Sequence, residues 1–118
     1  MLKNLLIVED NAAMRRLIKS VVEDLAANIY ECEDGSEALA AYEQHHPEWV
    51  VMDVEMKEKD GITATREIVG SHPEANILIL TRDGSDRLRE QAKQAGAAKL
   101  VLKEDLISIR QIYDQANR

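Results

Sequence analysis

The sequence predicts an α/β fold in which a parallel sheet of five strands is covered by helices on both faces. Short apolar segments alternate along the 118 residues with longer segments whose apolar residues recur at helical spacing. The short segments, such as LLIV and ILIL, are continuously apolar, which is typical of strands buried on both faces of a parallel sheet. Right-handed crossovers between such strands place all their carboxyl ends at one edge.

The strands are predicted wherever a short apolar run is bounded by polar or turn-forming residues. The first, second and fourth runs contain isoleucine, which suits a pleated and buried surface. The third begins with a tryptophan, and the fifth is the shortest. The predicted strands are residues 5–8, 29–32, 49–52, 77–80 and 100–102.

The first two helices follow the first two strands. Asn11 is expected to cap the first helix, because its side-chain oxygen suits the free amides of a helix start. Ser36 is expected to cap the second helix, residues 37–44, after a turn at Asp34-Gly35. The first helix carries an apolar stripe expected to face the core, formed by Met14, Leu17, Ile18, Val21, Val22 and Leu25.

The remaining helices are bounded by glycine and proline. The third spans residues 61–69 and is expected to end near Gly70, and the fourth spans residues 86–95 and stops at Gly96. The apolar residues of the last helix are Leu106, Ile109, Ile112 and Tyr113.

Composition excludes some classes of function. The formal net charge is −7, which argues against a sequence-independent grip on nucleic acid and against binding to an anionic membrane surface. No segment approaches the length of a transmembrane span or the pattern of a signal peptide. We therefore expect one domain in the cytoplasm, with no direct binding of nucleic acid or membrane.

Five polar residues come directly after predicted strands. Glu9 and Asp10 follow the first strand, Asp53 the third, Thr81 the fourth and Lys103 the fifth. Because the carboxyl ends of parallel strands meet at one edge, and ligands bind there, we expect these side chains to lie together.

The three acids of this group indicate a metal site. Carboxylates a few ångströms apart repel one another, and a divalent cation removes the conflict. Oxygen ligands and an incomplete cage favour Mg²⁺, which keeps several waters and accepts phosphate oxygens. One carboxylate then remains free as a nucleophile for phosphoryl transfer. Thr81 is able to donate a hydrogen bond to a phosphoryl oxygen, and Lys103 to neutralise another.

Several motifs together carry a resemblance to a known family. They are Ile7-Val8-Glu9-Asp10, Met52-Asp53-Val54-Glu55-Met56 with Asp60-Gly61, Thr81, Ala95-Gly96-Ala97 and Lys103. In this order and spacing the chain resembles the receiver domain of two-component response regulators. The resemblance covers essentially the whole chain, residues 1–118, as one receiver domain. It implies a doubly wound, flavodoxin-like sheet with the strand order 2-1-3-4-5.

The resemblance also implies a role for each site residue. Asp53 would be the phosphoacceptor, and it would ligate Mg²⁺ together with Asp10 and the backbone carbonyl of Glu55. Glu9 would hold a water bound to the metal. The hydroxyl of Thr81 and the ammonium of Lys103 would contact the phosphoryl group.

The implied partners are proteins. Asp53 would take its phosphoryl group from a phosphohistidine on a sensor histidine kinase or a phosphotransfer protein. The output would pass to a downstream protein or to an output domain missing from this chain, and a homodimer is left open. We expect no enzyme activity beyond self-directed phosphotransfer and dephosphorylation.

The chain departs from the family pattern at four positions. Leu100 replaces an aromatic residue, which weakens the link between Thr81 and the output face. Lys57 replaces a proline and leaves its loop less constrained, and Glu104 replaces another, so we expect a trans peptide bond after Lys103. Arg82 replaces a very small residue. It is expected to gate access to Asp53, where Glu55 or Asp83 could draw it over the site; the alternatives are contact with the phosphoryl group itself or a side chain that points into solvent.

Two other functions are alternatives to a phosphoacceptor switch. A receiver-like module that binds partners without being phosphorylated is the main alternative, and Arg82 and Leu100 give it some support. A phosphatase with an aspartyl nucleophile would carry that nucleophile on the first strand, with a second acid two residues later. The segment 5–10 lacks that arrangement.

Overall fold

The computed structural model describes residues 1–116 and shows strands and helices in alternation. Two short 3₁₀ turns, η1 (Gly35–Glu37) and η2 (Lys103–Asp105), precede the second and fifth helices. The strands are β1 (Leu2–Val8), β2 (Ala26–Cys32), β3 (Trp49–Asp53), β4 (Ile77–Thr81) and β5 (Lys99–Leu102). The helices are α1 (Ala12–Val22), α2 (Ala38–His45), α3 (Gly61–Ser71), α4 (Asp86–Ala95) and α5 (Ser108–Ala116).

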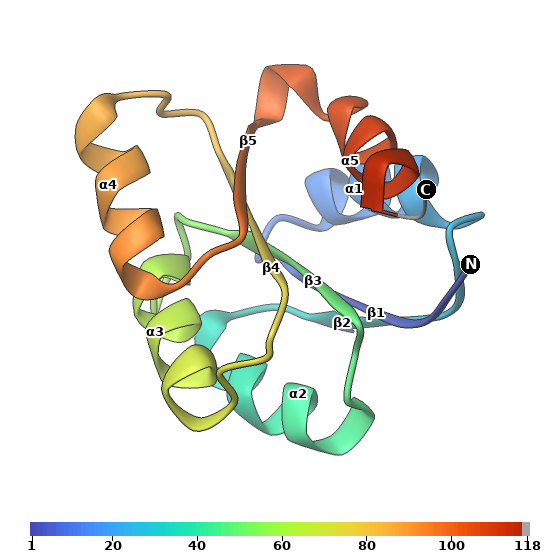
Figure 1. Cartoon of the computed structure of the whole chain (residues 1–118), viewed down its shortest axis with the longest axis horizontal. Coiled ribbons are helices and arrows are strands. Elements are labelled where there is room, and N and C mark those ends of the chain that lie inside the picture. Colours follow the sequence, from blue (N-terminus) through green and yellow to red (C-terminus); the bar gives the residue numbers. More distant parts are fainter. Residues whose placement is uncertain (117–118) are drawn as a thin grey trace.

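All neighbouring strands pair in parallel, in the order β2-β1-β3-β4-β5. The predicted doubly wound sheet and its strand order are confirmed (Figure 1). Strand β2 lies on one side of β1, and the chain then crosses to β3 on the other side. In sheets of this kind, ligands bind at the carboxyl ends of the strands where the winding reverses. That point lies between β1 and β3.

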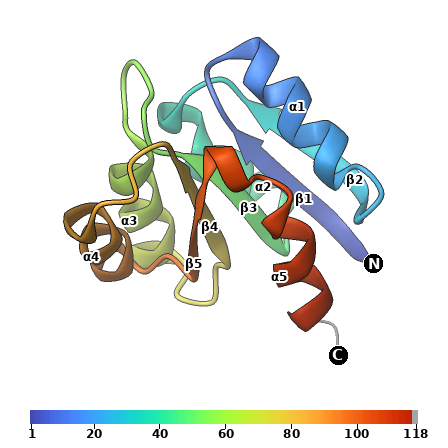
Figure 2. The ribbon, with the colours of Figure 1, turned by 90° about the horizontal axis from the view of Figure 1, so that it is seen from above.

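Helices cover the sheet in two layers. Helices α1 and α5 lie over one face, and α2, α3 and α4 lie over the other (Figures 1 and 2). Along β1, Leu5 and Ile7 pack in the core under α1 and α5, whereas Leu6 and Val8 pack in the opposite core. Residues of β3 and β4 alternate in the same way. Both faces of these strands are buried, which is why their apolar runs are continuous.

The predicted apolar stripe of α1 is wrong at one position. Leu17 is 49% exposed, although it was expected to face the core. Ile18 and Val22 are fully buried, and Met14 and Val21 lie at the margin of the core. The helix therefore turns a narrower face to the sheet and to α5 than its apolar periodicity indicated.

Helix ends agree with prediction in two places. Asn11 caps α1, and its side chain accepts a hydrogen bond from the Met14 amide at 2.8 Å. Helix α4 stops at Gly96 as expected. The peptide bond between Lys103 and Glu104 is trans, as predicted, and no cis bond occurs in residues 1–116.

The predicted cap of the second helix is wrong. Asp34, not Ser36, caps the turn that starts this region, and Ser36 lies inside η1. The Glu37 side chain completes a capping box by accepting hydrogen bonds from the Asp34 and Glu33 amides, at 3.1 and 2.9 Å. Asp and Ser are both good N-caps, so the sequence alone did not separate them.

Other boundaries shift by a few residues. Strand β2 begins at Ala26, earlier than predicted, and α3 continues through Gly70 to Ser71. Leu106 precedes α5, which begins at Ser108, yet its side chain is buried as expected.

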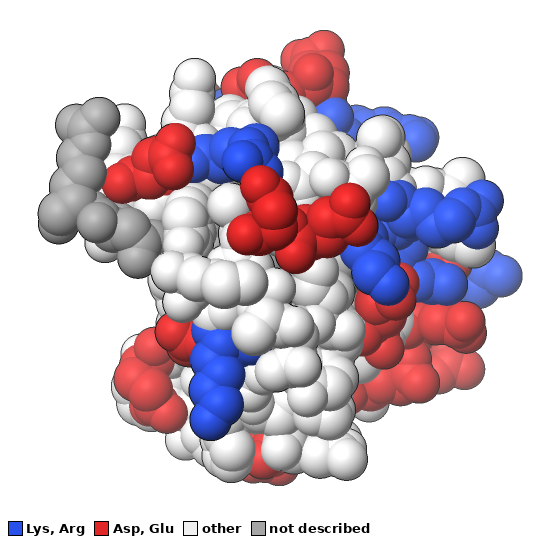
Figure 3. Space-filling model, turned by 90° about the vertical axis from the view of Figure 1, so that its right-hand side faces the viewer, with Lys and Arg blue, Asp and Glu red and all other residues white. Residues whose placement is uncertain are grey.

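No helix within residues 1–116 has both the length and the apolarity that a membrane crossing requires. Figure 3 views the molecule from the right-hand side of Figure 1, where β1 begins. Acidic and basic side chains lie next to one another there, without an extensive area of one sign. Ion pairs between neighbouring elements are also present: the Arg110 guanidinium of α5 contacts Asp24, after α1, at 2.6 and 3.1 Å.

Candidate functional site

The sheet brings the predicted site residues together at its carboxyl edge. Glu9 follows β1, Asp53 and Thr81 end β3 and β4, and Lys103 follows β5. Glu9, Asp53 and Thr81 are each only 1% exposed, and Asp10 is half-buried. Contacts join four of the five side chains, those of Glu9, Asp10, Asp53 and Lys103, and Thr81 ends the strand that pairs with the Asp53 strand.

Three carboxylates form the acidic part of the site. One oxygen from each of Glu9, Asp10 and Asp53 lies within 4.8 Å of the other two. The three residues come from the ends of β1 and β3, at the reversal of strand order. Their mutual repulsion in a buried setting requires positive charge nearby.

Lys103 supplies one positive charge. Its Nζ lies 2.7 Å from Asp53 Oδ1 and 3.4 Å from Glu9 Oε1, and its side chain is 11% exposed. Burial alone would lower the pKa of Lys103, but Asp53 and Glu9 together raise it above the ordinary lysine value. The ammonium therefore stays charged and bridges the two acids.

Glu9 has an unusual protonation equilibrium. Burial raises its pKa to about 7, and the nearby Asp53 adds to the rise. The Asn11 amide, which donates to Glu9 Oε2 at 3.2 Å, and Lys103 act in the opposite direction. Near neutral pH, the metal-free site therefore holds less negative charge than three ionised carboxylates would give.

The buried oxygens of this site fit a hard cation. Apart from the Lys103 ion pairs, Asp53 Oδ1, Asp53 Oδ2 and Glu9 Oε1 have no hydrogen-bond partner among the described residues. Buried carboxylate oxygens without partners are costly, and a divalent cation with carboxylate and water ligands would satisfy them. The donor set is all oxygen, as Mg²⁺ requires.

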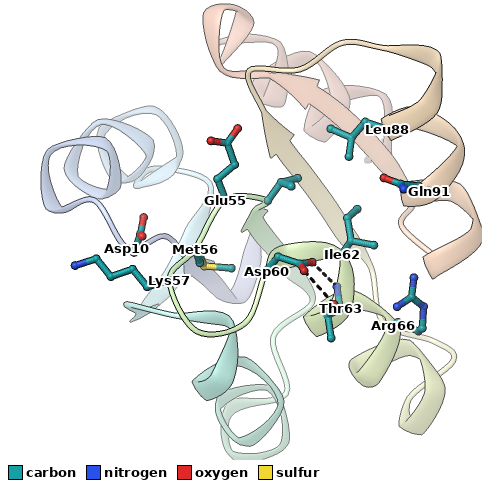
Figure 4. Close-up of a pocket in the computed structure, with 11 residues that line it drawn as sticks. Asp10, Glu55, Met56, Lys57, Asp60, Ile62, Thr63, Arg66, Leu88 and Gln91 are labelled. Carbon is teal, nitrogen blue, oxygen red and sulfur yellow. Dashed lines mark hydrogen bonds between the residues drawn. The ribbon is translucent and has the colours of Figure 1, made fainter.

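The acidic cluster opens into a pocket of about 710 Å³ between the segment after β3 and helices α3 and α4. Figure 4 shows Asp10 and Lys57 next to each other on one side of this pocket, with Met56 nearer its centre and Glu55 above Met56. The Glu55 side chain is exposed and is not part of the three-carboxylate cluster. Leu88 and Gln91 of α4 line the far wall.

Arg15 supports the site, and the sequence analysis missed it. Its Nη1 donates to the Glu9 carbonyl oxygen at 2.8 Å, and its Nε lies 3.2 Å from Glu31 Oε1 of β2. The Arg15 side chain is only 15% exposed. It therefore holds the segment after β1 against the edge of the sheet. In the sequence, only the acidic residue Glu31 indicated this contact, and many acidic residues have no basic partner.

Thr81 and its neighbour occupy different environments. The Thr81 hydroxyl accepts a hydrogen bond from the Asp83 amide at 3.0 Å, which leaves its own hydrogen free to donate. Arg82 is exposed and lines a pocket of about 430 Å³ with Met14, Lys103 and Glu104.

The expected pairing of Arg82 is not observed. In the described part of the chain no ion pair joins it to Glu55 or Asp83. Its side chain instead lies on the side of the site where Lys103 and α1 meet. Leu100 is partly buried and packs against the core under α3 and α4.

Residues 5–114 match the family model of the response regulator receiver domain. The chain belongs to the response regulator receiver domain family. It is thus a component of two-component signalling, in which receiver domains act as phosphoacceptor switches between histidine kinases and output partners. The resemblance inferred from the site motifs is confirmed.

Curated relatives agree with this assignment. The chain is 38% identical over 104 residues to the chemotaxis protein CheY of Bacillus subtilis (strain 168), which is 87% of each chain. It is 34% identical over 102 residues to CheY of Thermotoga maritima, covering 86% of this chain and 85% of that one. The transcriptional regulatory protein PdtaR of Mycobacterium tuberculosis (strain H37Rv) is 37% identical, and the match covers 90% of this receiver chain but 52% of that protein.

Solved structures show the same fold. A two-component response regulator of the LuxR family from Aurantimonas sp. SI85-9A1 superposes with a TM-score of 0.84 at 28% identity. The match covers 95% of this chain and 85% of that one. The chemotaxis protein CheY4 of Vibrio cholerae superposes with a TM-score of 0.83 at 22% identity, over 96% and 99% of the two chains.

Proposed function

We propose that this receiver domain is switched by phosphorylation of Asp53, with a phosphohistidine of a sensor histidine kinase or a phosphotransfer protein as the donor. One observation carries the proposal. The Asp53 carboxylate lies buried at the centre of the site, 2.7 Å from the Lys103 ammonium, and it has no other hydrogen-bond partner among the described residues. Lys103 therefore holds the Asp53 carboxylate in position, and no other hydrogen bond among the described residues occupies the lone pairs of its oxygens.

The transfer is a displacement at phosphorus. An Asp53 oxygen forms the new P–O bond while the P–N bond of the phosphohistidine breaks, and the bonding electron pair stays on the imidazole nitrogen. Catalysis of such a transfer is mostly positioning and charge stabilisation. Lys103 would move from the carboxylate to a phosphoryl oxygen, and the free Thr81 hydroxyl hydrogen would bond to another.

The residues present fit Mg²⁺. Asp10, Asp53 and the backbone carbonyl of Glu55 would hold the ion, with Glu9 in its outer shell. When bound, it would neutralise charge on the carboxylates and on the incoming phosphoryl group. The support for this assignment is the three-carboxylate cluster and its unpartnered buried oxygens.

Partner proteins would approach by the exposed side of the site. Leu17 and Ile107 are 49% and 61% exposed, on α1 and just before α5, and Met14 lines the pocket that Lys103 also lines. These exposed apolar side chains, together with the pocket that Met14 and Lys103 line, would form part of the surface on which a partner docks. The output would then pass to a partner protein or to an output domain outside this chain. We keep the expectation of a single receiver domain, residues 1–118, working in the cytoplasm.

The proposal is tested by intact mass after incubation with acetyl phosphate and Mg²⁺. The wild-type chain should gain the mass of one phosphoryl group, and Asp53→Ala should gain none. Glu104→Gln is the matched control, because Glu104 is an exposed acid beside the site that is assigned no role. A phosphoryl group on Asp53→Ala would refute the assignment. No modification of the wild type would favour a module that binds partners without phosphorylation.

A further inference from the structure

The segment between β3 and α3, residues 54–60, is held to a turn from another part of the chain by a single carboxylate. Asp34 follows β2, and its side chain accepts three backbone hydrogen bonds. Its Oδ1 accepts from the Glu58 amide at 3.1 Å. Its Oδ2 accepts from the Lys59 amide at 3.2 Å and from the Ser36 amide at 2.8 Å.

The turn and the loop also touch through their backbones. A Cβ atom on Gly35 would lie 2.3 Å from the Lys59 carbonyl oxygen, so only glycine permits this approach. Ser36 Oγ donates to Glu58 Oε2 at 3.3 Å. The loop is thus fixed at residues 58–59 to an element more than twenty residues earlier in the sequence.

The end of the loop is fixed as well. The Gly61 amide donates to the Val54 carbonyl at 2.8 Å, and Asp60 caps α3 by accepting from the Thr63 amide at 2.8 Å (Figure 4). Between these anchors lies the segment that carries Glu55. Lys57 was expected to leave this loop less constrained, and Asp34 supplies a separate constraint from outside the loop.

The Asp34 carboxylate is well suited to this role. Burial would raise its pKa, but the hydrogen bonds from the Ser36, Glu58 and Lys59 amides lower it below the ordinary value. The ionised form accepts charge-assisted hydrogen bonds, which are stronger than neutral ones. The acids Glu33 and Glu58 and the cation Lys57 line the same pocket of about 430 Å³, and backbone amides supply the hydrogen bonds that hold the Asp34 carboxylate there.

We propose that Asp34 is a positioning residue for the metal site, because it fixes the loop that presents the Glu55 backbone beside Asp10 and Asp53. This inference rests on the proposed function, since it takes the Glu55 carbonyl as a metal ligand. The simpler reading is that Asp34 only caps η1. Glu37 separates the two readings: it caps the same turn through the Glu33 and Asp34 amides, and it makes no hydrogen bond to the loop.

The test compares Asp34→Ala with Glu37→Ala. Mg²⁺ affinity is measured by isothermal titration calorimetry, and amide hydrogen exchange is measured at Glu58 and Lys59 by NMR. Partners in the outer shell of a metal site typically change affinity by 10- to 100-fold. Asp34→Ala should weaken Mg²⁺ binding by about tenfold and accelerate exchange at both amides. Glu37→Ala should change the affinity by less than about twofold, because it leaves the loop anchored.

A second variant keeps the test valid if Asp34→Ala unfolds. Asp34→Asn retains one acceptor oxygen, so it should show a smaller loss of Mg²⁺ affinity and faster exchange at one of the two amides. Equal effects of Asp34→Ala and Glu37→Ala would reduce Asp34 to a helix cap and overturn the proposal. Faster exchange with unchanged Mg²⁺ affinity would also overturn it.

The readouts separate this inference from the proposed function. Mg²⁺ binding that depends on Asp34, in a chain that acetyl phosphate does not modify, would contradict only the phosphoacceptor assignment. Phosphorylation of the wild type combined with unchanged Mg²⁺ affinity in Asp34→Ala would contradict only the positioning role. A wild-type chain that binds no Mg²⁺ would contradict both.

Discussion

Gly61, the first residue of α3, lies directly against the backbone of Asp53 at the end of β3. It is buried, and its amide donates to the Val54 carbonyl at 2.8 Å. A Cβ atom placed on Gly61 would lie 1.9 Å from the Asp53 carbonyl oxygen, whereas such contacts essentially never fall below 3.0 Å. In Gly61→Ala the start of α3 and the end of β3 must therefore separate by about 1.1 Å.

The separation should affect both stability and function. Adding a methyl group to a well-packed site costs about 1–3 kcal/mol, so the free energy of unfolding should fall by about 2 kcal/mol. A displacement of about 1 Å near reacting groups can slow a reaction by about a hundredfold. Urea unfolding measures the first effect. The rate of phosphorylation by acetyl phosphate measures the second, at a temperature where the variant is folded.

Gly70→Ala is the matched control on the same helix. Gly70 is exposed, and a Cβ atom there would meet nothing within 4 Å. Alanine favours helix by about 1 kcal/mol relative to glycine, so this variant should be slightly more stable and equally reactive. If Gly61→Ala matched wild type in stability and rate, the close approach to Asp53 would have no consequence and the reasoning would fail. A loss of stability with an unchanged rate would show that the displacement does not reach the carboxylate.

Three further predictions concern other parts of the molecule. Thr65 is fully buried, and its hydroxyl has no hydrogen-bond partner among the described residues. Thr65→Val should therefore raise the free energy of unfolding, measured by urea titration, by about 1 kcal/mol. A loss of stability would instead reveal a hydrogen bond of the hydroxyl in solution. The pKa of Glu9, about 7, lies above its usual value of 4.5, so the metal-free site holds a proton below neutral pH that Mg²⁺ must displace. Mg²⁺ affinity should therefore fall as pH drops below 7, with proton release in calorimetry at pH 6, and Glu9→Gln should abolish both; a pH-independent affinity in the wild type would contradict this. Arg82→Ala should accelerate both phosphorylation by acetyl phosphate and loss of the phosphoryl group, since Arg82 lines the pocket beside Lys103. Unchanged rates would place Arg82 in solvent, and slower phosphorylation would show that it assists the transfer.

The fold could be predicted from the sequence because the apolar runs of the strands and the periodicity of the helices indicated the same architecture. The strands around Ile7 and Ile79 are buried on both faces, so their apolar runs are unbroken and contrast with the amphipathic helices between them. The site was readable for the same reason. Glu9, Asp53 and Thr81 directly end or follow strands, and a parallel sheet leaves little freedom in where such residues lie.

The errors arose where a contact depends on tertiary geometry. Periodicity places Leu17 on an apolar face but does not give the width of the face that the sheet covers, and Leu17 lies beyond it. Arg15 acts on a backbone carbonyl, and such a contact has no signature in residue types. Asp34 was assigned to a turn, yet two of its three backbone partners lie more than twenty residues away, in the segment after β3.

The charge balance of the site shows that the single Lys103 ammonium does not neutralise the three carboxylates. Three ionised carboxylates facing the single Lys103 ammonium leave a net charge of −2, and two of the three, those of Glu9 and Asp53, are buried. Protonation of Glu9 removes one of these charges near neutral pH, which fits its raised pKa. A bound divalent cation would balance both, so that Glu9 could ionise and Lys103 could leave Asp53 Oδ1. In the proposed transfer, that oxygen would then be available to attack phosphorus and the ammonium to contact the transferred group. In this arrangement Lys103 competes with the metal for the carboxylates and would also contact the phosphoryl group. Lys103→Met should therefore bind Mg²⁺ more tightly than wild type. It should nevertheless be phosphorylated more slowly. Weaker Mg²⁺ binding in that variant would show that Lys103 orders the acids rather than competing with the cation.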